Sequence, residues 1–246
     1  MGGKIDCYLD LASLYSYLAF LELQKNKDLL ASHNVEVEYH PVLLGAINVG
    51  SGNRPPWTLP SKATYGVHDA RRAIARHTPP PAIAFPADLM KSGMTVLPLR
   101  CLHYIKRRHP RATFLAALHG LFEAFWAPPN GDLTGVEGVR GALRGLSVRG
   151  VSRVGGGDGG LLFTEGEVEE VLAAAETEEM KGLLKRTTQE ALEKGAFGAP
   201  WLWVRDREGR EEPFFGSDRF HFVYKFLGLP YTDVTLLPAG ETKGKL

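Results

Sequence analysis

The N-terminal stretch KIDCYLDLASLYSYL, residues 4–18, changes from an alternating pattern to a helical one. Apolar and polar residues alternate through residues 4–10, which predicts a strand with one buried face. Apolar residues then recur at helical spacing over residues 13–30, which predicts a helix. Alternation returns over residues 35–39, and Pro41 marks the exit. These three segments predict a βαβ unit whose two strands are parallel.

The middle of the chain is predicted to be mostly helical. Helical spacing covers residues 62–77 and 97–126, separated by the proline-rich residues 78–82, where helix is disfavoured. Residues 51–60 are rich in Gly, Asn and Pro and are predicted to form a loop. Residues 127–160 are rich in Gly and lack the pattern of a phosphate-binding loop, so we expect a mobile insertion there.

The C-terminal third returns to strands. Residues 200–204 and 212–215 flank a turn-rich segment, which predicts a β-hairpin. Gly216-Ser-Asp218 is predicted to open a last helix, which would end near Gly228.

Thr164 and Glu167 have the spacing of a capping box and predict a helix start, with helical character continuing to about Gly195. The full order is therefore βαβ, a block of helices, then a helix, a β-hairpin and a helix. This is the order of an α/β thioredoxin-like fold with an inserted all-helical domain, the DsbA-like arrangement. The expected division is a thioredoxin-like part over residues 1–62 and 183–246 and a helical domain over residues 63–182.

Composition excludes several classes of protein. The chain has 246 residues, 44% of them hydrophobic, and a formal net charge of +1, which is typical of a globular protein and not of a general nucleic-acid binder. It has no apolar run long enough for a membrane span and no apolar N-terminal segment typical of a secretory signal. Cys7 and Cys101 are too few for a disulfide framework or a metal cluster. We therefore expect an intracellular protein.

Charge is unevenly distributed. Residues 66–115 hold nine Lys or Arg against two Asp or Glu, and residues 165–193 hold nine acidic against three basic residues. Two interpretations are open: the segments pair with each other as neighbouring helices, or the basic segment attracts an acidic small substrate.

Four motifs lie in register along the chain: Asp10-Leu-Ala-Ser-Leu-Tyr-Ser-Tyr17, Gly50-Ser-Gly-Asn-Arg-Pro-Pro56 with Lys62, Phe197-Gly-Ala-Pro200, and Gly216-Ser-Asp-Arg219. Together they resemble the corresponding motifs of kappa-class glutathione transferases. That family is similar to 2-hydroxychromene-2-carboxylate isomerases and, more distantly, to disulfide oxidoreductases of the DsbA type. The resemblance covers nearly the whole chain except residues 134–162.

Ser13 lies where the first strand gives way to the first helix. A hydroxyl and the unpaired N–H groups at a helix N-terminus can stabilise an anion, although a serine there can also be a plain helix cap. The resemblance implies that Ser13 holds the sulfur of glutathione as a thiolate. Leu14, Tyr15 and Ser16 belong to the same turn and are predicted to contact glutathione, Tyr15 and Ser16 as secondary donors; the alternative for Tyr15 is a packing role. Leu14 departs from the proline that is usual in the family, and no CxxC stands here, so exchange by an internal dithiol is not expected.

The resemblance also implies the rest of the glutathione site. Ala199 and Pro200 would pair with the cysteinyl backbone, with Pro200 in the cis form; the alternative is an ordinary proline at a strand start. Ser217 and Asp218 would receive the γ-glutamyl end, or else serve only as helix caps. Asn53 and Lys62 would hold the glycyl end, with Lys62 as the charge for its carboxylate, unless Lys62 is a solvated surface lysine.

These features imply a glutathione S-transferase that attacks small electrophiles such as aromatic halides, reactive carbonyls or peroxides, in a cleft lined by Tyr15, Tyr17 and Trp57. Glutathione would be the co-substrate, and no metal is expected because the histidines lack ligand spacing. A glutathione-dependent isomerase is the nearest alternative, and a noncatalytic thiol- or peptide-binding module is the third. The resemblance further implies a homodimer in mitochondria or peroxisomes, and the cytoplasm stays open as a third location. The near-zero net charge and the lack of a long apolar run predict no nucleic-acid or membrane partner.

Overall fold

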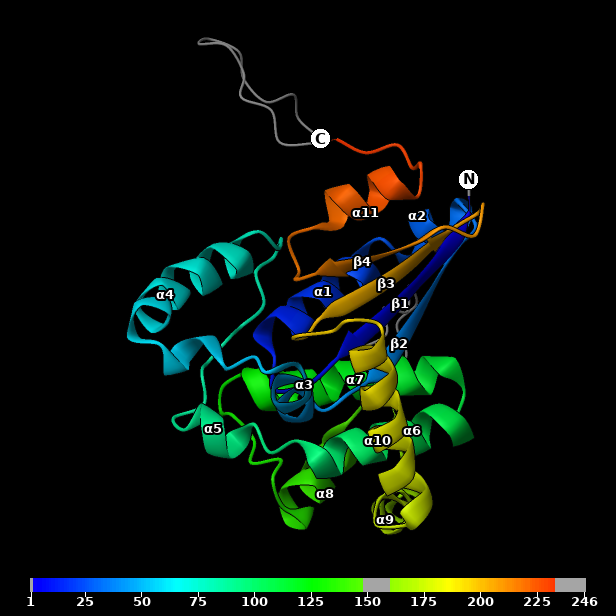
Figure 1. Cartoon of the computed structure of the whole chain (residues 1–246). Helices are drawn as coiled ribbons and strands as arrows, with labels where there is room; N and C mark the ends of the chain where they lie inside the picture. Colours follow the sequence, from blue (N-terminus) through cyan, green and yellow to red (C-terminus); the bar gives the residue numbers. More distant parts are fainter. Residues whose placement is uncertain (1, 148–159, 233–246) are drawn as a thin grey trace.

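The computed structural model describes residues 2–147 and 160–232, and it is built around one mixed sheet (Figure 1). The strand order is β2-β1-β3-β4. β1 (Gly3–Leu9) pairs in parallel with β2 (Val35–Pro41) and antiparallel with β3 (Trp201–Asp206), which pairs antiparallel with β4 (Glu211–Phe215). The predicted parallel βαβ unit and the predicted hairpin are both confirmed.

Helices fill the rest of the described chain. They are α1 (Leu14–Lys25), α2 (Lys27–Ser32), α3 (Leu44–Ser51), α4 (Pro60–Ala75), α5 (Leu89–Ser92), α6 (Val96–Arg108), α7 (Arg111–Trp126), α8 (Val136–Gly145), α9 (Glu165–Ala175), α10 (Glu178–Glu193) and α11 (Phe220–Phe226), with a 3₁₀ turn η1 (Pro56–Thr58) before α4. In Figure 1, α6 to α9 gather below the sheet, α11 lies above β4, and α4 projects to one side.

The sequence predictions need several corrections. The predicted helix over residues 13–30 is two helices, because Asn26 caps α1 through hydrogen bonds to Glu22 O. Helix α3 was not predicted. Residues 97–126 form α6 and α7, which are separated at His109 and Pro110.

Part of the predicted mobile insertion is ordered. Residues 136–145 form α8, and its Val139 and Leu143 side chains are fully buried. These two residues are four apart and lie on one face of the helix, so packing against the core outweighs the low helix propensity of its glycines. Residues 148–159 of the same predicted insertion lie outside the described residues.

The capping box at the start of α9 is confirmed. Thr164 Oγ accepts from the Glu167 N–H, and the Glu167 carboxylate accepts from the Thr164 N–H at 2.8 Å. Thr164→Ala is therefore expected to lower the free energy of unfolding by about 1 kcal/mol. Urea titration measures this, with Thr64→Ala in the exposed part of α4 as the control that should change little. Equal stability of Thr164→Ala and the wild type would contradict the role of this cap.

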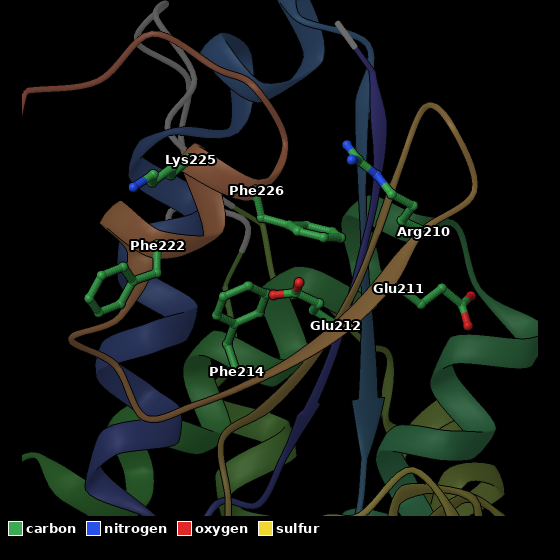
Figure 2. Close-up of a pocket in the computed structure, with 7 residues that line it drawn as sticks. All are labelled: Arg210, Glu211, Glu212, Phe214, Phe222, Lys225 and Phe226. Carbon is green, nitrogen blue, oxygen red and sulfur yellow. The ribbon is translucent and has the colours of Figure 1, made fainter.

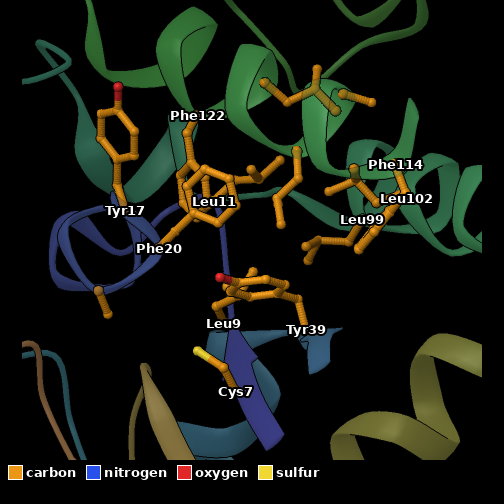
Figure 3. Close-up of a cluster of buried hydrophobic side chains, with 14 of the residues drawn as sticks. Cys7, Leu9, Leu11, Tyr17, Phe20, Tyr39, Leu99, Leu102, Phe114 and Phe122 are labelled. Atoms are coloured by element: carbon orange, nitrogen blue, oxygen red, sulfur yellow. The ribbon is translucent and has the colours of Figure 1, made fainter. Parts of the chain in front are cut away.

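The core lies between the sheet, α1 and the helices that follow β2. Ile5, Cys7 and Leu9 of β1 are fully buried, and so is Tyr8 on the other face, because β1 is an inner strand. Figure 3 shows the side chains of α1 meeting those of α6 and α7 next to β1. Tyr17 of α1 stacks on Phe122 with ring centroids 5.0 Å apart.

The indole of Trp126, 1% exposed, joins this core to the segment after β1, since its Nε1–H donates to Leu11 O at 2.8 Å. The loop between β1 and α1 is thus fixed by the end of α7.

Opposite charges pair between α6 and the helices α9 and α10. Arg107 lies 2.7 Å from Glu179, Arg100 lies 3.8 Å from Glu176, and the Tyr104 hydroxyl donates to Glu170. For α6 the structure therefore supports the interpretation that the basic and acidic segments pair as neighbouring helices.

The two edges of the sheet are protected in different ways. Along β2, Arg111 donates to Val37 O and Lys106 donates to Tyr39 O at 2.6 Å. Along β4, Pro213 occupies the middle of the strand and offers no N–H. Both basic residues that cover β2 come from helices of the predicted insertion.

The expected domain boundaries, between 62 and 63 and between 182 and 183, fall inside α4 and α10. That division remains a prediction. In the described part of the chain, no helix is both long and apolar enough to cross a bilayer.

Candidate active site at the start of helix α1

Ser13 is the N-cap of α1 and is 7% exposed. Its Oγ accepts from the Ser16 N–H at 3.1 Å and donates to Ala199 O at 2.8 Å. Within the described residues, no hydrogen bond uses the N–H groups of Leu14 and Tyr15. These free donors give the end of α1 partial positive charge beside the Ser13 hydroxyl, as an anion site requires.

The segment before β3 forms the opposite wall. The Ala199–Pro200 peptide bond is cis, which the sequence could only suggest, and Pro200 O accepts from the Gly216 N–H at 3.2 Å. The Phe215 ring lies over Gly198, where an added Cβ would come within 2.8 Å of the ring. Ala199 thus bonds to Ser13 on one side, while Gly198 and Pro200 on either side of it contact Phe215 at the end of β4 and the following Gly216.

Asn53 is brought to the same segment from the loop after α3. Its exposed side-chain amide donates to Phe197 O at 2.6 Å. The structure therefore brings Asn53, Ser13 and residues 197–200 together, although more than 140 positions of sequence separate Asn53 from Phe197.

Lys62 lies in the first turn of α4 and is exposed. Trp57, 39% exposed, stands before α4 with its indole N–H 3.3 Å from the sulfur of Met90. Exposed apolar side chains of this region include Leu59 and Tyr65.

Tyr15 points to α4, where its hydroxyl donates to the Asp69 carboxylate. Burial, then the bond to Asp69, raises the pKa of Tyr15, and the charge of Asp218 adds to the effect. Asp218 therefore lies on the same side of the molecule as Tyr15. Sequence reasoning missed Asp69, because nothing in the α4 pattern singles it out.

Ser217 and Asp218 do not cap α11. The helix begins at Phe220 with Arg219 as its N-cap, so the prediction that residues 216–218 open it is wrong by two to four positions. Ser217 is half-buried and Asp218 is exposed, and the Asp218 carboxylate pairs with Arg219.

Leu14 and Ser16 are buried beside Ser13, at 5% and 0% exposure. Ser16 Oγ accepts from the Asp10 N–H at 3.4 Å, so it faces the loop beneath the site. Tyr17 is 3% exposed and stacks in the core on Phe122. The expectation that Tyr17 lines the cleft is therefore wrong, because its position one turn into α1 faces the helices behind the sheet.

Asp10 was missed as a site residue. Its carboxylate is fully buried between Ser13 and two segments distant in sequence. Burial raises the pKa of Asp10 to about 6, against the lowering effect of its hydrogen bonds to Ala12, Thr95 and Leu44. The one feature of the sequence that could have pointed to Asp10 is its position, as a polar residue at the end of a predicted strand.

The other candidate chemical groups are inert by burial. Both cysteines are buried and free, and burial raises the pKa of Cys7 and brings that of Cys101 to about 12, so neither is a thiolate. His103 is packed as expected, 2.9 Å from Pro41 O, and burial lowers its pKa to about 4. No group of three ligand-type side chains suited to a metal ion occurs within residues 2–147 and 160–232.

Two hollows of the surface lie elsewhere. One, of about 550 Å³, lies between β4 and α11, where Phe214 and Phe226 face each other (Figure 2). The other, of about 400 Å³, lies against β2 and is lined in part by Lys27 and Arg111. Ser13 lines neither hollow; it lies between the start of α1 and residues 197–200, and the loop of Asn53 bonds to Phe197 of that same segment.

Residues 4–130 match the model of the DSBA-like thioredoxin domain, and the chain belongs to this family. It is 27% identical to glutathione S-transferase kappa 1 of Caenorhabditis elegans over 92% of each chain. It is also 27% identical to glutathione S-transferase kappa 1 of Homo sapiens, over 91% of this chain and 90% of the relative. These similarities agree with the resemblance that the four motifs predict.

Among solved structures, 2-hydroxychromene-2-carboxylate isomerase is similar with a TM-score of 0.67 and 20% identity, covering 92% of this chain and 94% of that one. At this identity the likeness supports the fold, a thioredoxin-like sheet with a helical insertion.

Proposed function

We propose that the protein is a glutathione S-transferase in which Ser13 stabilises the glutathione thiolate. The observation that carries the proposal is the position of the Ser13 hydroxyl, at the N-terminus of α1 and 2.8 Å from Ala199 O, next to cis-Pro200. The similarity to kappa-class transferases over more than nine-tenths of the chain supports it.

The chemistry follows from the donors at this helix end. The Ser13 hydroxyl, now bonded to Ala199 O, has one proton and would turn it toward the glutathione sulfur. The free N–H groups of Leu14 and Tyr15 add positive potential. A thiol in this field ionises more readily, giving its proton to solvent. The thiolate then attacks an electrophilic carbon: on an aryl halide the C–S bond forms, and the halide leaves with the electrons of its bond to carbon.

The peptide itself would lie across residues 197–200. The Ala199 carbonyl oxygen has a second lone pair, and the Ala199 N–H forms no hydrogen bond to the described residues. Both backbone groups of Ala199 can therefore pair with the cysteinyl backbone of glutathione. Asn53 and Lys62 would hold the glycyl carboxylate. Ser217 and Asp218 would hold the γ-glutamyl end, with Asp218 meeting its ammonium group.

The binding proposal predicts a specific effect at Asn53. Asn53→Ala removes the bond to Phe197 O, so the loop loses its tie to residues 197–200 and the KM for glutathione is expected to rise about fivefold to tenfold, with kcat changed less. Steady-state kinetics measures both constants. Asn48→Ala, in the neighbouring helix α3, is the matched control. A change in kcat alone, with KM unaltered, would contradict this role.

Conjugation of glutathione to an activated aryl chloride tests the function directly. The transferase reading predicts a glutathione conjugate and release of chloride. The isomerase alternative predicts a rearranged product with glutathione recovered unchanged when a 2-hydroxychromene-2-carboxylate is supplied. A noncatalytic module predicts binding of glutathione with neither product.

The remaining expectations rest on the resemblance and are part of the proposal: a detoxifying role, a homodimer, and a place in mitochondria or peroxisomes. Light scattering of the purified chain decides the oligomeric state.

A further inference from the structure

Asp10 is a fully buried carboxylate at the end of β1 that no step of the proposed reaction uses. Its Oδ1 accepts from the Ala12 N–H at 3.0 Å and from the Thr95 hydroxyl at 2.7 Å. Its Oδ2 accepts from the Leu44 N–H at 2.7 Å. All three partners donate to it, and the two backbone N–H groups can do nothing else, so the ionised carboxylate is the form that keeps all three bonds.

The backbone of Asp10 holds the same loop. Its carbonyl accepts from the Ser13 N–H at 3.1 Å, and its N–H donates to Ser16 Oγ at 3.4 Å. Together with the bond to Ala12, these contacts fix the turn that places the Ser13 hydroxyl at the start of α1.

The Leu44 contact reaches a second part of the site. Leu44 is the first residue of α3, whose N-cap Leu43 has no side-chain hydrogen bond, so Asp10 supplies the anion at this helix start. At its other end α3 leads into Asn53, which bonds to Phe197 O. The third partner, Thr95, precedes α6 and belongs to the predicted helical insertion.

We propose that Asp10 is a positioning residue that fastens the Ser13 loop, helix α3 and the start of α6 to one another. Glutathione then binds tightly only while the Asp10 carboxylate is ionised. The inference rests on the proposed function, since it concerns the affinity of that same site. Asp10 touches neither the peptide nor the electrophile and acts through Ala12 and Leu44.

The surroundings of Asp10 make its protonation consequential. The segments packed against it, residues 11–17, 42–51 and 92–99, contain no Lys, Arg, His, Asp or Glu. Their titratable groups are Tyr15 and Tyr17, and burial raises the pKa of both. Burial likewise raises the pKa of Asp10 to about 6. Below that pH the carboxyl carries a proton that neither backbone N–H can accept. A hydrogen bond from Ala12 or Leu44 then weakens, or the Thr95 bond reverses as the Thr95 hydroxyl turns toward Gly93 O, 3.5 Å away.

The test is the affinity for S-methylglutathione, whose sulfur cannot ionise, measured by titration calorimetry between about pH 7.5 and about pH 5. The wild type is expected to lose about tenfold in affinity, because roughly ten in eleven Asp10 carboxyls are protonated one unit below their pKa. Asp10→Asn should bind weakly, with no slope over this range. Asp6→Asn, which disturbs a carboxylate of the same strand paired with His40 and Lys4, should keep the wild-type slope.

Thr95 supplies a second pair of variants in case Asp10→Asn does not fold. Thr95→Val removes one donor and should shift the midpoint of the pH dependence upward, whereas Thr95→Ser keeps the hydroxyl and should restore the wild-type profile. A flat wild-type profile, or an Asp10→Asn variant that keeps the slope, would overturn the inference.

A second measurement separates this inference from the proposed function. The N–H groups of Ala12 and Leu44 should exchange with solvent faster in Asp10→Asn than in Asp6→Asn, which hydrogen exchange detects without any ligand. If the wild type does not bind S-methylglutathione at all, the proposed function fails. In that case unchanged protection of these two groups would overturn the fastening role as well, and lost protection would support it.

Discussion

Ser13→Ala is expected to lower kcat/KM for glutathione transfer at least about tenfold, the effect of removing one positioned donor to a stabilised anion. The variant loses the hydroxyl proposed to donate to the sulfur, while the N–H groups of Leu14 and Tyr15 remain and would account for residual activity. It also loses the bonds to Ser16 N and Ala199 O, so a loss of about 1 kcal/mol in unfolding free energy accompanies the change.

The measurement that isolates this effect is ultraviolet difference absorption of the bound thiolate at neutral pH. The wild type should show the thiolate band and Ser13→Ala a weaker one at equal saturation with glutathione. Ser32→Ala, an exposed serine at the end of α2, provides a control that should match the wild type. A full band in Ser13→Ala would refute the role of Ser13 in activating sulfur, and no band in the wild type would favour a binding module.

Trp126→Ala is expected to lower the free energy of unfolding by about 3 to 5 kcal/mol. The side chain is 1% exposed, contacts Phe85 and Phe125, and donates to Leu11 O, so the substitution leaves both a cavity and an unsatisfied carbonyl. Against a typical total stability of about 5 to 15 kcal/mol, this is a large fraction.

Urea denaturation measures the loss of unfolding free energy. A more conservative variant separates the contribution of the hydrogen bond from that of the apolar volume. Trp126→Phe keeps most of the apolar volume and removes the hydrogen bond, so it should cost about 1 to 3 kcal/mol. Leu29→Ala, at a side chain 63% exposed, should stay within about 0.5 kcal/mol of the wild type. Equal effects of Trp126→Ala and Leu29→Ala would show that the indole does not support the core.

The elements that depend on residues close together in the sequence were the ones that the sequence predicted correctly. The strand at residues 4–10, the capping box at Thr164 and the hairpin after Pro200 each depend on neighbours within a few positions, and the structure has all three. Helix α8 was not predicted, because its glycines made the segment resemble a flexible loop although Val139 and Leu143 lie on one face. Gly138 is required by a close approach, because an added Cβ would overlap the backbone oxygen of Asp132.

The site was predictable only in part, for a related reason. Ser13 could be placed at a helix start from its own segment, and the structure adds its bond to Ala199. The roles of Asp10 and Asp69 depend on partners 34 to 85 positions away, which periodicity does not reveal. Tyr17 was misassigned because proximity in sequence to Ser13 does not decide which face of α1 a side chain occupies.

Helices α6 and α7 protect the edge strand β2, so a truncated chain without them is expected to behave differently. Lys106 and Arg111 occupy the outward carbonyls of Tyr39 and Val37, and both residues come from helices α6 and α7. Without those helices, β2 would present unpaired backbone groups along an edge strand, the kind of surface on which a second molecule adds as a further strand. The sheet residues produced alone are therefore prone to self-association, and the helices act for this protein as a built-in guard against aggregation.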